Sequence, residues 1–396
     1  MNPVVKITSK GAEYLKKGQS WMYANNLASD IDAYHNGSIV DIESEDGRYL
    51  GTGMLSKNSH ITVRIMSYDR HEVFDSAFFE NRIQQAWEFR KTVEGDNLDN
   101  CRIVFGEADF LPGLTVDRYN SVLVTQITSY GMEIRKDMIY QALLSVLGCD
   151  GQNVTAIYER NDVQSRLKEG LQLYKGFYGD TQVDPVQIIC ENGLLLHVDI
   201  ENGQKTGYFL DQKSNRVLLR HMAKGKRVLD CFTHTGGFAL NAAYGKAAHV
   251  TAVGVSATAL EEGRANAKLN HLDNVEFVQA DVFDYLDTLQ QGQYDVIVLD
   301  PPAFTKSRKT VMKAYNGYKR INQQAMHVLR HGGYLITCSC SRYMETDLFE
   351  KMLVEAAQET GVRLRQVSVT QQNGDHPILW TMNETSYLKF YIFQVW

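Results

Sequence analysis

Four segments of the sequence combine residue types that could bind a ligand or react with one. The first runs from Asp230 to Phe238 (DCFTHTGGF) and contains two adjacent glycines after a short apolar stretch. Glycines in such a loop let the backbone approach a bound molecule, and the amino end of a following helix offers free N–H groups. The spacing is not G-x-G-x-x-G, so a dinucleotide-binding loop is disfavoured. A tight turn without a ligand remains the alternative for this loop alone.

The second and third segments place an acid and two thiols at the ends of later apolar runs. The run from Asp300 to Phe304 (DPPAF) follows YDVIVL, and the strand must end there because proline cannot donate to a sheet ladder. Cys338 and Cys340 lie two residues apart in TCSCS, so they would share one face of a strand. Such a pair makes a strained disulfide and a poor metal site. A helix-capping Asp and inert buried cysteines are the alternatives.

The fourth segment, residues 305–320, begins directly after Phe304 and carries cations, two tyrosines and no acid. This composition predicts a segment that faces phosphates, with Tyr315 and Tyr318 as stacking aromatics. A solvated helix face is the alternative interpretation. The cations that would face the phosphates are Lys306, Arg308, Lys309, Lys313, Lys319 and Arg320.

The elements that must position these segments form a regular pattern from about residue 188. Short apolar runs alternate with helical spacing, which predicts an α/β fold with a parallel, doubly wound sheet. Residues 362–369 and 387–395 read as two closing strands, expected to pair as an antiparallel hairpin at one edge. Ligands of such sheets bind outside the carboxyl ends of the strands. The Gly-bearing loop, DPPAF and the cysteine pair would all lie at that edge.

The preceding part of the chain follows other patterns. The first 73 residues read as a small, β-rich module with a turn at Glu45-Asp46-Gly47, and residues 74–185 mix helical and strand patterns, as in an α+β module. We therefore expect three domains, with boundaries at 1–73, 74–185 and 186–396.

Composition limits the class of protein. The 396 residues are 44% hydrophobic and 22% charged, as in an ordinary globular chain. No run approaches 18 apolar residues, and no apolar region precedes the first charges, so neither a membrane span nor a secretory signal is expected. The 6 cysteines include no C-x-x-C pair, which favours a reducing cytosol and predicts no bound metal. The net charge of −6 argues against purely electrostatic binding of nucleic acid.

Together these motifs resemble the bacterial 23S ribosomal RNA cytosine-C5 methyltransferases, which carry an N-terminal PUA domain and use S-adenosylmethionine. The resemblance rests on residues 202–212 (NGQKTGYFLDQ), the Phe232 loop, DPPAF and Ser339-Cys340-Ser341. Residues 106–118 and 159–163 match the family's middle domain. The resemblance implies a PUA-like first domain and a Rossmann-like methyltransferase domain at the end.

The resemblance also implies a cofactor site. Asp281 would accept a hydrogen bond from the adenine amino group. Gly254 stands where this class usually has an acid for the ribose hydroxyls, so Ser256, Asp230 or a water would replace that contact. The implied cofactor-binding residues are Thr206, Tyr208, Asp211, Phe232, Thr235, Gly236, Gly237, Phe238, Asp281, Val282, Asp300 and Pro301.

The reaction implied by the family needs a thiol, because C5 of cytosine is a weak nucleophile until a thiolate adds at C6. The carbon at C5 can then attack the sulfonium methyl group. The resemblance assigns the thiolate to Cys340, and Cys338 remains a second candidate. Asp300 would contact the N3 and N4 edge of the base. The base that removes the C5 proton is not identified by the sequence.

The expected partner is ribosomal RNA, 23S or a large-subunit precursor, from which the target cytosine must leave its stack. No membrane partner is expected, and a homodimer is left open. Two other functions compete. A methyltransferase acting on an exocyclic amine of a base or protein would need no Cys, and a non-catalytic RNA-binding assembly factor would bind no cofactor. A nicotinamide-dependent oxidoreductase is disfavoured by the glycine spacing.

Overall fold

A computed structural model describes residues 2–181 and 183–396. The chain divides into two compact units. The first unit holds residues 1–187, 198–210 and 374–385, and the second holds residues 188–197, 211–373 and 386–396. The chain therefore passes between the units more than once. Each unit is described separately below.

The amino-terminal part of the first unit is a five-stranded sheet in the order β1-β3-β4-β5-β2 with one short helix. Strands β3 and β4 form the hairpin predicted around Gly47, where φ is +82°. Gly53 allows β4 and β5 to approach, since a Cβ there would lie 2.4 Å from the carbonyl oxygen of Arg64. The elements are β1 (Val4–Ile7), α1 (Ser9–Lys16), β2 (Trp21–Tyr23), β3 (Ile39–Ser44), β4 (Tyr49–Leu55) and β5 (Ile61–Ser67).

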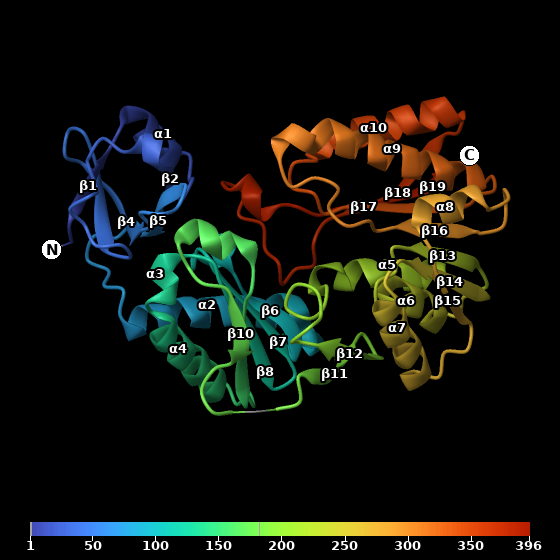
Figure 1. Ribbon diagram of the computed structural model, residues 1–396, viewed down its shortest axis with the longest axis horizontal. Helices are drawn as coiled ribbons and strands as arrows, with labels where there is room; N and C mark the ends of the chain where they lie inside the picture. The colour runs from blue at the N-terminus through green and yellow to red at the C-terminus, as the bar shows by residue number, and fades with distance from the viewer. Residues whose placement is uncertain (1, 182) are drawn as a thin grey trace. The chain divides into compact units, whose positions relative to one another are not determined.

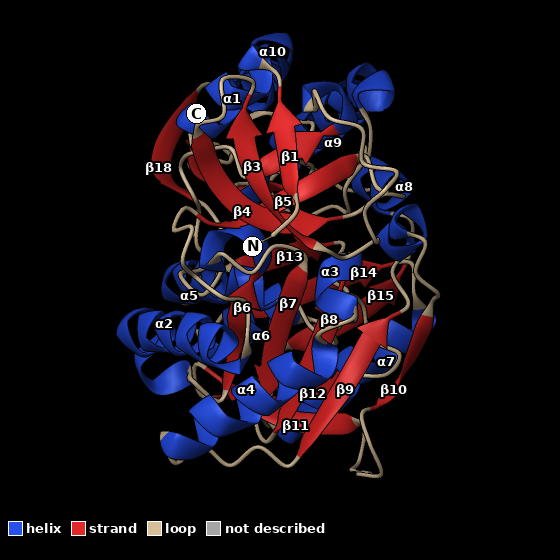
Figure 2. Ribbon diagram, turned by 90° about the vertical axis from the view of Figure 1, so that its left-hand side faces the viewer, coloured by secondary structure: helices blue, strands red, loops and turns tan. Residues whose placement is uncertain are grey.

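A second five-stranded sheet follows in the order β10-β9-β8-β7-β6, with α2 and α4 packed beside it (Figure 2). Its core includes Trp87 of α2 and Leu143 of α4, both fully buried. Two helices lie between β8 and β9, since α3 ends at Glu133 and α4 begins at Lys136. The elements are α2 (Ser76–Glu94), β6 (Asn100–Phe105), β7 (Leu114–Tyr119), β8 (Val122–Ile127), α3 (Tyr130–Glu133), α4 (Lys136–Cys149), β9 (Ala156–Asn161) and β10 (Tyr174–Phe177).

Residues 374–385 belong to the first unit through a buried polar network. Asp375 accepts a hydrogen bond from the backbone N–H of Arg102 at 2.9 Å, and its carbonyl accepts from Arg90 at 3.0 Å. Arg90 is itself fully buried and paired with both oxygens of Asp109. His376 contacts the Asp375 carboxylate at 2.7 Å. The Asp-His-Pro sequence therefore anchors a late segment to the middle sheet.

The second unit is built on a seven-stranded sheet in the order β15-β14-β13-β16-β17-β19-β18. The first five strands are mutually parallel, while β19 is antiparallel to both β17 and β18. Helices α5, α6 and α7 lie on one face of this sheet, and α8, α9 and α10 lie on the other (Figure 1). This is the doubly wound α/β fold with an antiparallel edge that the sequence predicts.

The bounds of the elements in this part are close to those expected from the pattern. A two-stranded sheet, β11 (Val186–Glu191) with β12 (Leu194–Asp199), precedes it. The remaining elements are α5 (Lys213–Met222), β13 (Arg227–Cys231), α6 (Gly237–Tyr244), β14 (His249–Gly254), α7 (Ala257–Leu269), β15 (Val275–Gln279), α8 (Val282–Asp287), β16 (Val296–Leu299), α9 (Val311–Val328), β17 (Tyr334–Ser339), α10 (Thr346–Thr360), β18 (Leu364–Thr370) and β19 (Lys389–Val395).

No helix within 2–181 and 183–396 is long and apolar enough to cross a bilayer. The same residues contain no group of three or more His, Cys, Asp or Glu side chains arranged to hold a metal ion.

Candidate active site

The parallel strands of the second unit bring the predicted site residues to one edge of the sheet. Because β13 to β17 all point the same way, their carboxyl ends meet there. These ends carry the Gly-bearing loop after Cys231, Gly254, Asp281, Asp300 and Cys340. The juxtaposition that the sequence predicts is thus present.

Hydrogen bonds to Asp230, near the end of β13, hold the loop between β13 and α6 in a tight conformation. Phe232, His234 and Gly236 have φ of 62°, 53° and 87°, so the chain turns repeatedly through the left-handed region. Asp230 fixes this turn, since its Oδ2 accepts from the Thr233 hydroxyl at 2.6 Å and from the Ala239 N–H at 2.9 Å. The loop is therefore preorganised at the amino end of α6.

Asp230 supports the loop and does not face a ligand. Its side chain is fully buried, and burial raises the pKa of this carboxyl to about 7. Its Oδ1 atom is buried without a hydrogen-bond partner. The prediction that Asp230 could take the ribose hydroxyls is wrong, because no part of the carboxyl reaches the surface.

The structure leaves room for a side chain at Gly254, where the family that the sequence resembles usually has an acid. Gly254 ends β14 with an ordinary backbone conformation, and a Cβ there would lie 3.6 Å from the nearest side-chain atoms, which belong to Leu260 and Thr233. Ser256 caps α7, accepting from the Ala259 N–H at 3.3 Å. His234 also lies nearby, with its backbone N 4.0 Å from that Cβ position, and burial lowers the pKa of its ring. The sequence analysis did not single out His234.

The other predicted cofactor residues of the second unit have clear structural positions. Asp281 is exposed and caps α8, accepting from the Phe283 N–H at 2.8 Å, while Val282 is buried in the core. Thr235 and Phe238 are nearly buried, and the Phe238 ring stacks on Phe390 at 6.1 Å. Their contacts with a cofactor stay predictions.

Asp300 and Cys340 lie at neighbouring strand ends. Asp300 is partly exposed and accepts a hydrogen bond from Gln212 Nε2 at 3.2 Å. Cys340 is also partly exposed, and its Sγ lies 4.0 Å from the carbonyl oxygen of Pro301. A carboxylate and a thiol therefore lie just beyond the ends of the adjacent strands β16 and β17, as addition to a base would require.

The two candidate thiols differ in access. Cys338 lies within β17 and is fully buried, and its pKa is raised well above the usual value mainly by desolvation. Cys340 lies one residue beyond the end of β17 and is reached by solvent. Because the thiolate is the reactive form, burial disfavours Cys338 as a nucleophile.

Thr206 and Tyr208 belong to the first unit, whereas Asp211 belongs to the second. The Thr206 hydroxyl donates to Asp117 Oδ2 at 2.5 Å, and the Tyr208 N–H donates to the Tyr119 hydroxyl at 3.2 Å. Asp211 accepts from the Tyr387 hydroxyl at 2.6 Å. All three side chains are buried. The sequence did not point to their partners, and their role toward a cofactor stays a prediction.

The cationic segment is exposed only in part. Lys306, Arg308, Lys309 and Lys313 are exposed, but Lys319 pairs with Glu355 and Glu359 of α10. Arg320 lies 3.6 Å from Asp287 and over the Phe283 ring. Tyr315 and Tyr318 are buried in the core under α9, so the expectation that they stack on RNA bases is wrong. Their spacing of three residues places both on the inner face of the helix.

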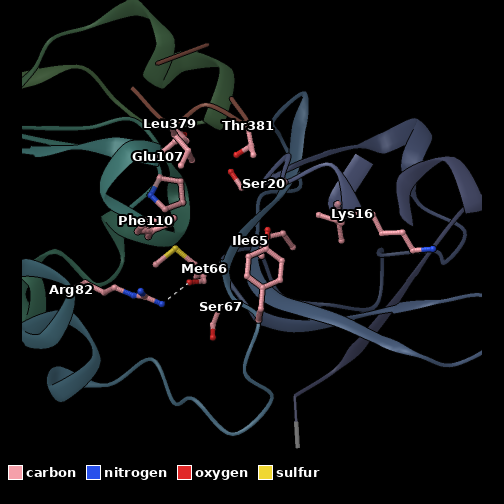
Figure 3. A pocket seen from close by; sticks show the side chains of 14 residues that line it. Lys16, Ser20, Ile65, Met66, Ser67, Arg82, Glu107, Phe110, Leu379 and Thr381 are labelled. Carbon is pink, nitrogen blue, oxygen red and sulfur yellow. Dashed lines mark hydrogen bonds between the residues drawn. The ribbon is translucent and has the colours of Figure 1, made fainter. Parts of the chain in front are cut away.

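The first unit contains a separate cavity of about 310 Å³ that the sequence did not predict (Figure 3). Residues of β5 form one side, and Arg82, Glu107 and Phe110 form another. Arg82 donates to the Met66 carbonyl at 3.3 Å, while Phe110 is 48% exposed. None of the predicted catalytic or cofactor-binding residues lines this cavity.

The carboxyl edge of the seven-stranded sheet fits S-adenosylmethionine. It combines a preorganised glycine loop at a helix amino end, room beside Gly254 and an exposed carboxylate at Asp281. Residues 179–383 match the family described as S-adenosylmethionine-dependent methyltransferase, and residues 5–68 match a PUA-like domain. Fold and site thus define a methyltransferase that uses this cofactor.

Curated relatives agree with that class, and a solved structure has the same fold. The ribosomal RNA large subunit methyltransferase I of Klebsiella pneumoniae strain 342 is 41% identical over 97% of this chain and 96% of its own. The protein of that name from Escherichia coli O139:H28 is 39% identical over 97% of each chain. A solved structure assigned as a SAM-dependent methyltransferase from Streptococcus mutans has a TM-score of 0.83 at 23% identity, covering 99% of this chain and 100% of that one. The chain belongs to the ribosomal RNA large subunit methyltransferase I family.

Proposed function

We propose that this protein methylates C5 of a cytosine in 23S ribosomal RNA, in the cytoplasm, with Cys340 as the nucleophile. The observation that carries the proposal is the position of Cys340, a partly exposed thiol 4.0 Å from the Pro301 carbonyl and next to β16, which Asp300 follows. The names of the relatives support ribosomal RNA as the substrate class.

Each residue has one task in this proposal. The Cys340 thiolate adds to C6 of the base, which makes C5 nucleophilic. Asp300 hydrogen-bonds the N3 and N4 edge and stabilises the charge that develops there. When bound, S-adenosylmethionine supplies an electrophilic methyl group. Loss of the C5 proton then lets the thiolate leave.

The remaining assignments concern binding. The loop of Phe232 and Thr235 to Phe238, with Asp211, Asp281 and Val282, would hold the cofactor. A role for Thr206 and Tyr208, which belong to the first unit, rests on the resemblance alone. The exposed cations Lys306, Arg308, Lys309 and Lys313 are the best candidates for phosphate contacts, because none of them forms an ion pair with an acid within residues 2–181 and 183–396. Lys319 and Arg320 are weaker candidates because acids of the same unit neutralise them.

The test is methyl transfer from labelled S-adenosylmethionine to hypomethylated ribosomal RNA, followed by nucleoside analysis. Wild type should label C5 of cytosine, Cys340→Ala should lose the label, and Cys338→Ala should keep it. Label on an exocyclic amine that survives Cys340→Ala would support the amine methyltransferase instead. No label, together with no saturable heat on titration with S-adenosylmethionine, would support a non-catalytic assembly factor.

A further inference from the structure

Lys389 is a buried cation that the reaction proposed above does not use. It is the first residue of β19 and pairs with Ser339 of β17 in the antiparallel ladder. Lys389 is only 6% exposed, and a lysine is almost never buried without a compensating partner. Within the part of the chain that the structure describes, it forms no ion pair, and its ammonium makes one hydrogen bond. The burial of this ammonium without an ion pair among the described residues therefore indicates a specific role.

The ammonium is anchored next to Cys340. Its Nζ donates to the carbonyl oxygen of Ser341 at 2.9 Å, while the backbone of Lys389 pairs with Ser339. The lysine thus holds the residue on each side of Cys340. It fixes the segment that carries the thiol and brings a positive charge close to it.

The surroundings of Lys389 leave this charge without a direct counter-ion. Cys340 and Glu345 both favour its charged form, whereas burial opposes it and lowers the pKa of Lys389 to about 8. At pH 7 the amine is therefore still mostly protonated. A cavity of about 230 Å³ beside it is lined by groups that are uncharged at neutral pH, namely Thr346, Val369, Thr370, Gln371 and Tyr391.

We propose that the ammonium of Lys389 stabilises the thiolate of Cys340 and so prepares it to add to the base. Electrostatic coupling is reciprocal, so a thiolate that favours the ammonium is itself favoured by it. The thiol proton leaves to solvent, and Lys389 keeps its protons throughout. Lys389 is a positioning residue that acts through Cys340, and the inference rests on the proposed role of that thiol.

The test measures the thiol without RNA or cofactor. Alkylation of Cys340 by iodoacetamide is followed by mass spectrometry from pH 5 to pH 10, in wild type, Lys389→Met and Lys389→Arg. The exposed Cys149 and Cys190 serve as internal references for reagent reactivity. Lys351→Met is the matched control, because Lys351 is an exposed lysine on α10. Thermal melting identifies any variant that fails to fold.

We expect the midpoint for Cys340 to rise by about one pH unit in Lys389→Met, which slows alkylation at pH 7 about tenfold. Lys389→Arg should retain most of the wild-type midpoint, and Lys351→Met should match wild type. An unchanged midpoint in folded Lys389→Met overturns the inference. A wild-type midpoint at or above that of free cysteine, about 8.5, would also overturn the inference. This second outcome does not depend on the folding of any variant.

The outcome is separable from that of the proposed function. Methyl transfer to RNA is measured on the same proteins as a function of pH. A shifted alkylation midpoint without any C5 methylation would refute the proposed function and leave the electrostatic role of Lys389 standing. C5 methylation together with an unshifted midpoint would refute the electrostatic role of Lys389 and leave the proposed function standing.

Discussion

At the scale of single residues, access separates side chains that the sequence makes equivalent. Cys338 and Cys340 are both flanked by small hydroxyl residues in TCSCS, and the alternation of a strand assigns both to one face. The two differ in exposure because β17 ends at Ser339. Cys338 is therefore buried within the sheet, whereas Cys340 lies beyond the end of the strand. Where a strand ends depends on its neighbours, so the sequence could predict the pair but not the exposed member.

Gly254 provides a prediction of improved cofactor binding. A carboxylate at this strand end has room, since the Cβ position is in ordinary contact distance of its neighbours. Gly254→Asp should tighten binding of S-adenosylmethionine by about 1 kcal/mol, roughly fivefold in Kd, through hydrogen bonds to the ribose hydroxyls. Isothermal titration measures this change. Gly254→Asn separates hydrogen bonding from charge, and weaker binding by the Asp variant would contradict a ribose at this place.

Asp230 gives a prediction of pH-dependent stability. Its pKa is raised in the folded state to about 7, so the folded protein binds a proton that the unfolded chain releases near pH 4. Its contribution to stability is therefore full below about pH 4 and is lost as the pH rises toward 7. Asp230→Asn removes this loss, so its melting temperature relative to wild type should rise from pH 5 to pH 8.

Melting curves of the two proteins at a series of pH values give the difference directly, because the other titrating groups are shared. Ser256→Ala, which changes a cap on an exposed helix start, is a control without a titrating group. A difference that stays constant or falls over pH 5–8 would show that the Asp230 carboxyl is ionised throughout.

At the scale of elements, the order of the parallel strands along the chain can be predicted from the sequence, whereas the buried face of each helix is harder to predict. Alternation of apolar runs and helical spacing gives the strand sequence, and the antiparallel pair β18–β19 follows from the lack of a helical pattern between them. The buried tyrosines of α9 were misread as exposed because aromatic residues beside lysines suggest RNA stacking. Their spacing, the same signal that marks a core face, was the better guide.

The segment before α9 yields a prediction about RNA binding. The triple change Lys306→Gln, Arg308→Gln and Lys309→Gln removes three exposed charges, so affinity for RNA should fall and the slope of log K against log salt should become shallower by about 2–3. Fluorescence anisotropy over a salt series measures both quantities. Lys319→Gln is the matched control, because Glu355 and Glu359 already engage that lysine and little change is expected. Equal effects from both proteins would exclude a specific role for the segment.

At the scale of the whole molecule, the two units are not consecutive stretches of sequence. Residues 198–210 and 374–385 belong to the first unit, although the pattern of the sequence places both inside the final domain. The buried contacts responsible join distant residues, as between Thr206 and Asp117 or between Asp375 and the backbone of Arg102. Local periodicity carries no information on such pairs. The boundaries at 73 and 185 therefore stay predictions about pattern.

This division predicts that a fragment of residues 2–187 is less stable than the same residues in the full chain. The fragment keeps both five-stranded sheets but lacks the partners of several buried groups. Arg160 loses the carbonyls of Ile200 and Gly203, and Arg90 loses that of Asp375. A buried donor left without its acceptor costs about 1–3 kcal/mol, although each arginine keeps its carboxylate partner in the fragment. Asp117 would retain Arg102 but lose the Thr206 hydroxyl.

Hydrogen exchange measured by mass spectrometry gives the comparison for the same peptides in both proteins. Peptides of β7 and β9, which carry Asp117 and Arg160, should exchange faster in the fragment, whereas β3 and β4, which make none of these contacts, should change less. Asp375→Ala in the full chain should reproduce part of the effect at β6 through the lost bond to Arg102. Equal protection of β7 and β9 in the two proteins would mean that residues 198–210 and 374–385 contribute little to the stability of the first unit, and that the unit folds from its first 187 residues alone.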